Sequence, residues 1–427
     1  MSDSARPRPS GLYRWAILIF VSLAMFGNYY VYDCIAPLAD LLARQLHFSD
    51  SNIGLLQAIY SIPNVVMVLI GGYIVDRIGT RKSIFIFGTI CLIGSIVTVL
   101  SPVLAVMASG RLIFGLGAES LIVAVTTALA KWFRGKELSF AFGINLMIAR
   151  LGTWLAQNSP TWASFAYTNW RTPLLISIAF ASFCVIGPAV YWILEAYAEK
   201  HFEVGQQGST DKVVFSDIFK FGLSYWYIVA LCIVFYSAIF PFETFAIKFF
   251  IEAHGTSRQL GGFLVSILTA STMFGTPLFG LFVDKVGKRA LLMMLGSTLL
   301  IPVYLMMAYT HISLYVPMAM MGIAFSLIPA VMWPSVAYIV DQSKLGTAYG
   351  LMTMIQNIGL AGFNLLVGWA NDYSHAGPNN PAGYHLGMWI FSILGFLGLL
   401  FAFLLRQREI GPQGHGLETI TTATAAA

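Results

Sequence analysis

The chain of 427 residues alternates long apolar runs with short polar segments. An apolar run of about 20 residues is long enough to cross the hydrocarbon core of a bilayer as a helix. The pattern therefore predicts an all-α polytopic membrane protein with twelve transmembrane helices. The predicted spans lie near 15–42, 52–75, 83–101, 103–132, 138–162, 172–195, 222–250, 260–283, 290–310, 312–340, 345–370 and 384–405.

One long polar segment, at 196–221, follows the sixth span and divides the chain into six-helix bundles at 15–195 and 222–405, with tails at 1–14 and 406–427. The positive charges give an orientation, because cytoplasmic loops carry an excess of Lys and Arg. With the N-terminus inside, 18 of the 24 Lys and Arg residues fall in cytoplasmic segments. Three fall in outside loops, namely Arg44, Arg171 and Arg258. We therefore expect both termini to be cytoplasmic.

The two bundles repeat each other in sequence. GGYIVDRIGTRK, which ends at Lys82, returns as FGLFVDKVGKRA, so that Asp76 matches Asp284 at an offset of 208. AFGINLMIARLG returns as AYGLMTMIQNIG at an offset of 207. The second offset pairs Tyr29 with Tyr236, Glu119 with Ser326 and Arg150 with Asn357. Two parallel repeats are typical of transporters whose site lies between the halves, so the repeat predicts a pseudo-symmetric carrier.

The composition argues against other classes of protein. Apolar residues make up 58% of the chain and charged residues 10%, which is too little charge for the surface of a soluble protein of this length. The net charge of +5 does not indicate a nucleic-acid partner, because the basic residues lie between spans. All four cysteines fall inside apolar segments. We predict no metal, no cofactor and no enzyme, since the sequence has no metal cluster, phosphate loop or nucleophile–base set.

Two ionisable residues, Glu119 and Arg150, lie near the middle of the fourth and fifth spans. A charge at mid-bilayer costs roughly 2.5–3.5 kcal/mol on insertion scales, so such residues face an interior cavity and mark a substrate path. Arg offers a planar donor fork to a carboxylate, and Glu accepts from an ammonium group. The pair therefore predicts a site for a small zwitterion. The structural alternative is an ion pair between the two residues, which could also open to admit substrate.

Other polar and aromatic residues of the spans are candidates for lining the same site. Lys248 lies near the outer end of the seventh span, where it could bind substrate or extend its ammonium group to water. An acid, Glu243, lies about one turn before Lys248, so the residue that pairs with Lys248 stays open. Each remaining candidate could also be an ordinary packing residue; they are Tyr29, Tyr32, Tyr60, Trp333, Gln356 and Asn357.

Charged residues near the membrane surfaces are candidates for gating. The repeated loops lie where a span meets the cytoplasm and could contact the neighbouring bundle in one state and release it in the other; otherwise they only set topology. Their charged residues are Asp76, Arg77, Arg81, Asp284 and Lys285. Asp33 in the first span and Arg111 in the fourth form a second couple. These two residues either neutralise each other or act as a gate or proton sensor.

The Gly72–Lys82 and Gly280–Arg289 stretches match the signature loop of the major facilitator superfamily. Within it, GNYYVYDCIAPL, YSIPNVV, GRLIFGLGAES, WFRGKEL, MIARLG, FPF, WPSVAY and LGTAYGLMTMIQNIGLA resemble the major facilitator superfamily domain-containing protein 1 branch, over roughly residues 15–405. The resemblance implies facilitated transport of dipeptides with little regard to side chain. It also implies that Glu119 holds the peptide amine and Arg150 the carboxylate. The separation of a dipeptide's termini, roughly 5–7 Å, suits two side chains at one depth on neighbouring helices.

The sequence thus predicts a twelve-helix major facilitator carrier that moves dipeptides as a uniporter by alternating access. One alternative is a proton-coupled carrier of organic anions in which Glu119 carries the proton. Another is a membrane receptor or assembly subunit without transport activity. The expected partners are the small-molecule substrate and the lipid bilayer, with the protein working as a monomer and an accessory subunit left open. Because the sequence has no Asn-x-Ser/Thr acceptor and no dileucine-like signal, we expect a bacterial inner membrane.

Overall fold

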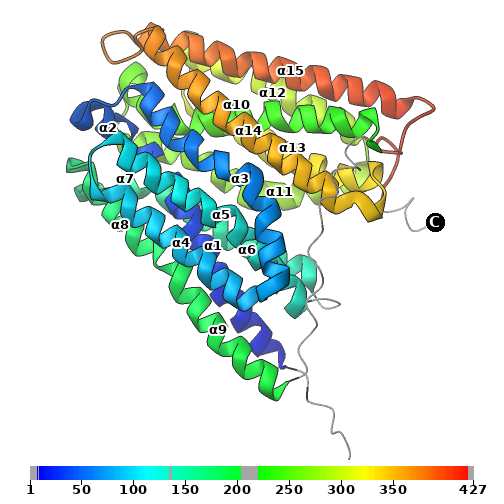
Figure 1. The fold of residues 1–427 in the computed structure, drawn as a ribbon. Helices are drawn as coiled ribbons and strands as arrows, with labels where there is room; N and C mark the ends of the chain where they lie inside the picture. The colour runs from blue at the N-terminus through cyan, green and yellow to red at the C-terminus, as the bar shows by residue number, and fades with distance from the viewer. Residues whose placement is uncertain (1–6, 8, 134–136, 203–219, 422–427) are drawn as a thin grey trace, which may run out of the picture. The chain divides into compact units, whose positions relative to one another are not determined.

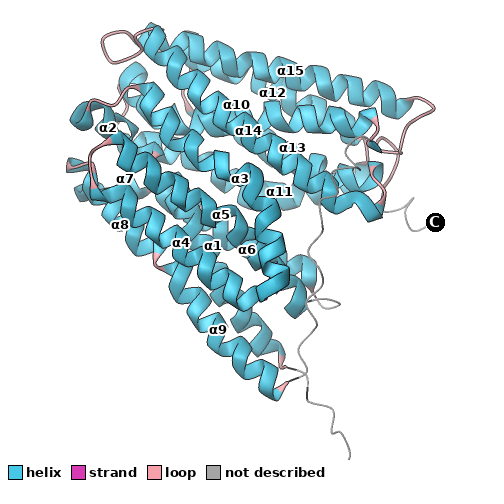
Figure 2. Ribbon diagram, in the orientation of Figure 1, coloured by secondary structure: helices cyan, strands magenta, loops and turns pink. Residues whose placement is uncertain are grey.

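The computed structural model describes residues 7, 9–133, 137–202 and 220–421. Regular secondary structure in this part of the chain is helical (Figure 2), apart from an isolated bridge between Gly377 and Asn380. The predicted all-α fold is confirmed. Five of the 18 Lys and Arg residues assigned to cytoplasmic segments lie outside the described residues, namely Arg6, Arg8, Arg134, Lys136 and Lys212.

The helices follow the predicted spans closely, and Figure 1 labels them along the chain. The N-terminal half of the sequence forms α1 (Gly11–Asp33), α2 (Ala39–Leu46), α3 (Asp50–Ile78), α4 (Thr80–Leu100), α5 (Leu104–Phe133), α6 (Leu138–Gln157), α7 (Ser159–Trp162), α8 (Arg171–Ala181) and α9 (Phe183–His201). The C-terminal half forms α10 (Leu223–His254), α11 (Arg258–Val286), α12 (Arg289–Tyr309), α13 (Tyr315–Ile339), α14 (Leu345–Tyr373) and α15 (His385–Ile410). Short 3-10 helices lie at Ala36–Leu38, Ser164–Thr168, Gln342–Lys344 and Pro381–Tyr384.

Most of these helices are long and apolar enough to cross a membrane. Within the described residues there are 10 such helices, or up to 11 if the two parts of α3, bent by 55°, count as one span. In this count α1 is joined to α2, and α8 to α9. The remaining predicted span, 138–162, corresponds to α6, which has 20 residues and is not among those helices.

The chain divides into two compact units. The first comprises Met1–Ile35, Ile59–Ala156 and Phe165–Lys212, and the second comprises Ala36–Ala58, Gln157–Ser164 and Val213–Ala427. The second unit therefore holds two segments from the N-terminal half of the sequence, including α2 and the start of α3. The predicted bundle boundary at 196–221 stays a prediction.

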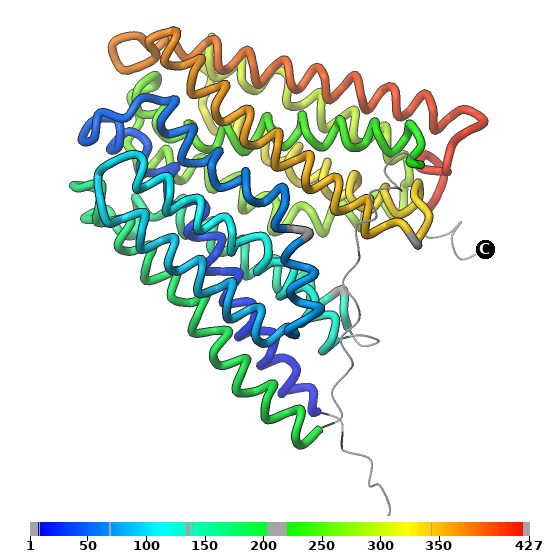
Figure 3. The backbone as a smooth tube through the Cα atoms, viewed as in Figure 1, coloured from blue at the N-terminus to red at the C-terminus, as the bar shows by residue number. Residues whose placement is uncertain are grey.

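Within the first unit, α4 packs along α5 and α9, and α1 packs against α8 and α9. Its core contains aromatic and small aliphatic side chains from these helices, such as Phe87, Phe114, Phe133 and Ala118. Within the second unit, α10 is the most enclosed candidate span, with 83% of its most apolar window buried, and it packs against α11, α14 and α15 (Figure 3).

Both repeated loops contain a glycine with a positive φ angle. Gly79 and Gly287 lie 208 residues apart and have φ angles of 83° and 68°. This conformation is strained for residues with a β-carbon, so glycine is required at both places. The positive φ angle shared by these two glycines supports the sequence repeat.

Candidate functional site

Arg150 and Tyr29 meet in the first unit, where α6 crosses α1. The Arg150 guanidinium carbon lies 5.7 Å from the centre of the Tyr29 ring, within the range of a cation–π contact. The approach depends on Gly152, because a β-carbon there would lie 2.2 Å from the carbonyl oxygen of Phe26. Glycine thus allows α6 close enough to α1 to bring the arginine onto the tyrosine ring.

Glu119 on α5 belongs to the same cluster. Both Glu119 and Arg150 lie within electrostatic range of the Tyr29 hydroxyl, and Glu119 also lies within that range of Tyr60. Glu119 and Arg150 are partly exposed, whereas Tyr60 on α3 is buried. The predicted acid and base therefore both lie near Tyr29.

Tyr32, Tyr60 and Arg111 form a second group of contacts in the first unit. The rings of Tyr32 and Tyr60 lie 4.8 Å apart, and the Arg111 guanidinium lies 5.7 Å from the Tyr60 ring centre. Arg111 donates to the carbonyl oxygens of Val31 at 2.9 Å and Tyr32 at 3.2 Å, near the end of α1. A cation at a helix C-terminus is stabilised by the exposed carbonyls. Asp33, the last residue of α1, lies within electrostatic range of Arg111 and Arg150, so the predicted couple is part of a larger charged group.

The second unit holds an aromatic group in place of these charges. The indole N–H of Trp333 on α13 donates to the Tyr236 hydroxyl at 2.9 Å, and the Tyr349 hydroxyl on α14 donates to the Trp333 carbonyl at 3.2 Å. Trp333, Tyr349 and Gln356 are partly exposed, whereas Tyr236 is buried. Gln356 lies near Cys232, with its Oε1 3.8 Å from the Cys232 Sγ.

Asn357, the repeat partner of Arg150, is buried and donates to the carbonyl of Thr353 at 3.1 Å. Ser326, the repeat partner of Glu119, is buried and donates to the carbonyl of Gly322 at 2.8 Å. The pairing of Glu119 with Ser326 stays a prediction.

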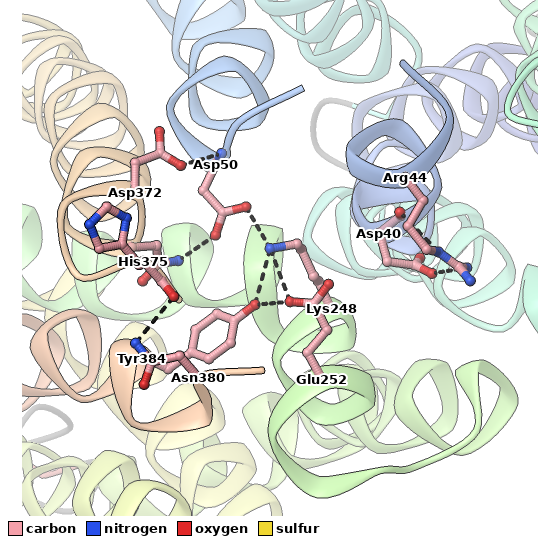
Figure 4. Close-up of polar contacts among 10 residues, drawn as sticks. Asp40, Arg44, Asp50, Lys248, Glu252, Asp372, His375, Asn380 and Tyr384 are labelled. Carbon is pink, nitrogen blue, oxygen red and sulfur yellow. Dashed lines mark hydrogen bonds and ion pairs between the residues drawn. The ribbon is translucent and has the colours of Figure 1, made fainter. Parts of the chain in front are cut away.

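Lys248 stands in a buried network of the second unit (Figure 4). Its Nζ lies 2.7 Å from Asp50 Oδ1 and 3.2 Å from Glu252, and it donates to the Tyr384 hydroxyl at 3.0 Å. Asn371 donates to the second oxygen of Asp50 at 2.9 Å. We call Asp50, Lys248, Glu252, Asn371 and Tyr384 the Lys248 network. Glu243 lies elsewhere, accepting a hydrogen bond from Gln157 at 3.4 Å.

Sequence reasoning missed the partners of Lys248, because Asp50 and Glu252 fall just beyond the predicted ends of their spans. One signal was available: Lys248 and Glu252 have the i,i+4 spacing of a helical ion pair. A second pair was also missed, between Arg258 and Asp40. Two nitrogens of Arg258 each lie 2.6 Å from an oxygen of Asp40, which also accepts from Arg44 at 2.6 Å.

The candidate gate residues differ between the two loop copies. In the first, Asp76 and Arg77 are exposed, and Arg81 pairs with Glu199 at 3.1 Å. In the second, Lys285 is exposed, and Asp284 pairs at 3.2 Å with Arg289, whose side chain is only 2% exposed. Arg289, the repeat partner of Arg81, also donates to the carbonyl of Ile420 at 2.6 Å.

No group of three or more His, Cys, Asp or Glu side chains suited to a metal ion occurs among the described residues. All four cysteines are buried with free thiols. The arrangement can hold a molecule by charge, hydrogen bonds and aromatic surface, and these are the means by which carriers bind small polar solutes.

Comparison with known proteins agrees with this fold. The model of the Major Facilitator Superfamily matches residues 21–363 and 237–421. The Lysosomal dipeptide transporter MFSD1 of Danio rerio is 34% identical over 371 residues, covering 84% of this chain and 80% of that protein. The MFSD1 of Homo sapiens is 33% identical over 380 residues, covering 85% and 81%.

Solved structures show the same fold at low identity. The nucleoside transporter NupG superimposes with a TM-score of 0.73 and 15% identity, covering 92% of this chain and 98% of that one. A bacterial homolog of the human lysosomal transporter Spinster, in an inward-facing and unoccupied conformation, gives 0.71 and 17%, covering 93% and 98%. This chain is a multi-pass membrane transporter of the Major Facilitator Superfamily, and within it resembles the MFSD1 branch.

Proposed function

We propose that this protein transports dipeptides by alternating access, as a uniporter. The observation that carries the proposal is the cluster of Glu119, Arg150 and Tyr29 in the first unit. The name of the MFSD1 relatives supports the choice of a dipeptide among possible zwitterions.

In this proposal the two charged residues bind opposite ends of the substrate. Arg150 binds the peptide carboxylate through its planar donor fork, while Glu119 accepts hydrogen bonds from the amine. Tyr29 packs its ring against the guanidinium and so limits the positions that Arg150 can take. Since both contacts are to the peptide termini, peptides with different side chains share one mode of binding.

Location and assembly belong to the same proposal. The Lys and Arg distribution supports cytoplasmic termini. We place the carrier in a bacterial inner membrane and expect it to work as a monomer. The loops around Asp76 and Asp284 serve as cytoplasmic gate elements that form and release contacts during the cycle.

The test measures binding of free and blocked dipeptides to the purified protein by thermal shift or calorimetry. Dipeptides with two free termini should bind, and N-acetylation or C-amidation should each weaken binding by roughly ten- to a hundredfold, because one charge-assisted contact is lost. In Arg150→Gln, C-amidation should no longer weaken binding, whereas N-acetylation should still weaken it. In Glu119→Gln, N-acetylation should no longer weaken binding, whereas C-amidation should still weaken it. Each variant is thus the control for the other.

Equal binding of free and blocked peptides by the wild type would contradict the assigned roles. Binding of organic anions without an amine, retained in Glu119→Gln, would favour the second candidate, a proton-coupled carrier of organic anions. In that candidate Arg150 binds the substrate and Glu119 carries the proton. The partial exposure of both side chains is the observation in favour of that candidate.

A further inference from the structure

A buried hydrogen bond joins α1 to α6 within the first unit. The Ser22 hydroxyl donates to the side-chain carbonyl of Asn145 at 3.0 Å, and the two residues are 0% and 5% exposed. Ser22 lies about two helical turns before Tyr29 on α1. Asn145 lies about one and a half turns before Arg150 on α6. The bond therefore links the two helices that carry the tyrosine and the arginine of the candidate site.

The face of α6 that meets α1 includes Asn145 and Gly152, which lie seven residues apart and so on one side of the helix. A β-carbon at Gly152 would lie 2.2 Å from the carbonyl oxygen of Phe26, so the two backbones approach closely there. Arg150 lies between these two contacts along α6. Sliding or rotation of α6 against α1 would therefore change the distance of 5.7 Å between the Arg150 guanidinium carbon and the Tyr29 ring centre.

The related pair in the second unit is apolar. At the offset of 207 the residues that match Ser22 and Asn145 are a valine and a methionine, 3% and 0% exposed, namely Val229 and Met352. The position related to Arg150 carries Asn357. The half of the chain that holds the arginine thus has a polar pair where the other half has an apolar one. A buried hydrogen bond adds little net stability over well-packed apolar groups, so stability alone does not explain the polar pair.

We propose that Ser22 and Asn145 are positioning residues that fix α6 against α1 and so hold Arg150 where it binds the peptide carboxylate. This inference rests on the proposed function. A hydrogen bond depends on both distance and angle, whereas apolar side chains keep their contact when two helices slide slightly. The bond and the close approach at Gly152 lie on either side of Arg150 along α6, so together they limit both sliding and rotation. Glu119 lies on α5, and the pair does not act on its contact with the amine.

The experiment measures binding of a free dipeptide and of its C-amidated and N-acetylated forms to the purified protein by calorimetry. In the wild type each modification should weaken binding by roughly ten- to a hundredfold. Ser22→Ala/Asn145→Leu removes the bond and replaces both partners by apolar groups of similar size. It should reduce the factor for amidation by about two- to tenfold, the range expected for one net hydrogen bond, because Arg150 is then less well placed. The factor for acetylation should stay within about twofold.

Thr244→Val/Asn364→Leu is the matched control. The Thr244 hydroxyl donates to the Asn364 side-chain carbonyl at 2.9 Å and joins α10 to α14 in the second unit, with both residues buried. Loss of this bond should leave both factors within about twofold of the wild type. If the double variant of the first unit does not fold, Ser22→Ala alone, which removes only a hydroxyl, must still lower the factor for amidation.

Two failures are distinguishable. If the wild type shows both factors but the Ser22 and Asn145 variants keep the factor for amidation, or lower both factors equally, the pair does not position Arg150 and this inference is wrong. If the wild type binds no dipeptide, or binds free and blocked dipeptides equally, the proposed function is wrong, and the inference falls with it.

Discussion

At the scale of single residues, Lys248 shows how a buried charge is accommodated. Its side chain is 5% exposed, and those of Asp50 and Glu252 are 4% and 9% exposed. Removing charges from water costs several kcal/mol per ion, which only close pairing and further hydrogen bonds offset. Tyr384 and Asn371 supply those bonds. The network thus joins the start of α3 to α10, to α14 and to the 3-10 helix Pro381–Tyr384 within the second unit.

Lys248→Met should therefore lower the thermal stability of the purified protein. Truncating one partner of a buried ion pair leaves an uncompensated charge and costs about 3–5 kcal/mol. The double variant Lys248→Met/Asp50→Asn should recover a large part of that loss, since it no longer buries an unpaired Asp50. The measurement is the midpoint of thermal unfolding in detergent. If the losses of stability from the two single substitutions simply added in the double variant, Lys248 and Asp50 would not act as a pair.

The sequence could locate Glu119 and Arg150 because charges within apolar runs are rare and costly. Of the partners of Lys248, the i,i+4 spacing could indicate Glu252 but not Asp50. Both residues lie outside the apolar run of their helix, Asp50 before the run of α3 and Glu252 after that of α10. Asp50 lies 198 residues from Lys248, so only the fold brings the two side chains together.

At the scale of elements, the C-terminal segment 411–421 completes the second loop copy. Glu418 accepts at its Oε1 from the backbone N–H groups of Ala290 at 2.9 Å and Leu291 at 3.2 Å, at the start of α12. The segment also accepts from Arg289 at the Ile420 carbonyl, and Leu417 is fully buried. A carboxylate at a helix N-terminus satisfies N–H groups that have no partner within the helix. In the first copy, Arg81 instead pairs with Glu199 of α9.

Glu418→Gln keeps an acceptor oxygen but removes the negative charge at the start of α12, so it should lower the thermal stability by about 0.3–1 kcal/mol. It should also raise the rate at which a thiol reagent labels a cysteine introduced at Val286, because the turn at Gly287 is then held less firmly by Glu418. Gln413→Ala, at an exposed position of the same segment, is the control and should change neither quantity. Unchanged stability and labelling in Glu418→Gln would show that the segment packs there without supporting the loop.

Element boundaries were predictable only where hydropathy changes at a helix end. The predicted span 290–310 and α12, Arg289–Tyr309, agree within one residue at each end. The predicted span 52–75 and α3 differ by two or three residues, because α3 begins at Asp50 and ends beyond the apolar run, at Ile78. The short helices α2 and α7 have 8 and 4 residues, too few for a periodic signal, and were not predicted.

At the scale of the whole molecule, the two halves repeat in architecture and differ in chemistry. The glycine turns at Gly79 and Gly287 have been retained in both copies. The charged group of the first unit, with Glu119, Arg150 and Asp33, has no charged equivalent in the second unit. The related positions there carry Ser326, Asn357 and Phe240. Architecture follows from the repeated apolar pattern, and hence was predictable. The division of chemistry between the halves required side-chain contacts.

That division leads to a test of energy coupling. If the protein is a uniporter, Glu119 binds the peptide amine and stays ionised while substrate is present. Uptake into proteoliposomes should then follow the peptide gradient alone, without stimulation by an inward proton gradient at fixed external pH. Glu119→Gln should reduce peptide binding and counterflow together, by roughly ten- to a hundredfold, because the amine loses its charged partner.

A proton-coupled carrier gives the opposite pattern for the same substitution. Glutamine imitates a protonated Glu119, so counterflow, which needs no net proton movement, should survive while accumulation driven by the proton gradient disappears. Glu243→Gln is the control, because Glu243 is a buried acid of α10 that accepts from Gln157 and lies outside the proposed site; its counterflow should stay within about twofold of the wild type. Retained counterflow in Glu119→Gln, together with proton-driven accumulation by the wild type, would replace the uniporter with a symporter in which this one carboxylate alternates between proton and substrate.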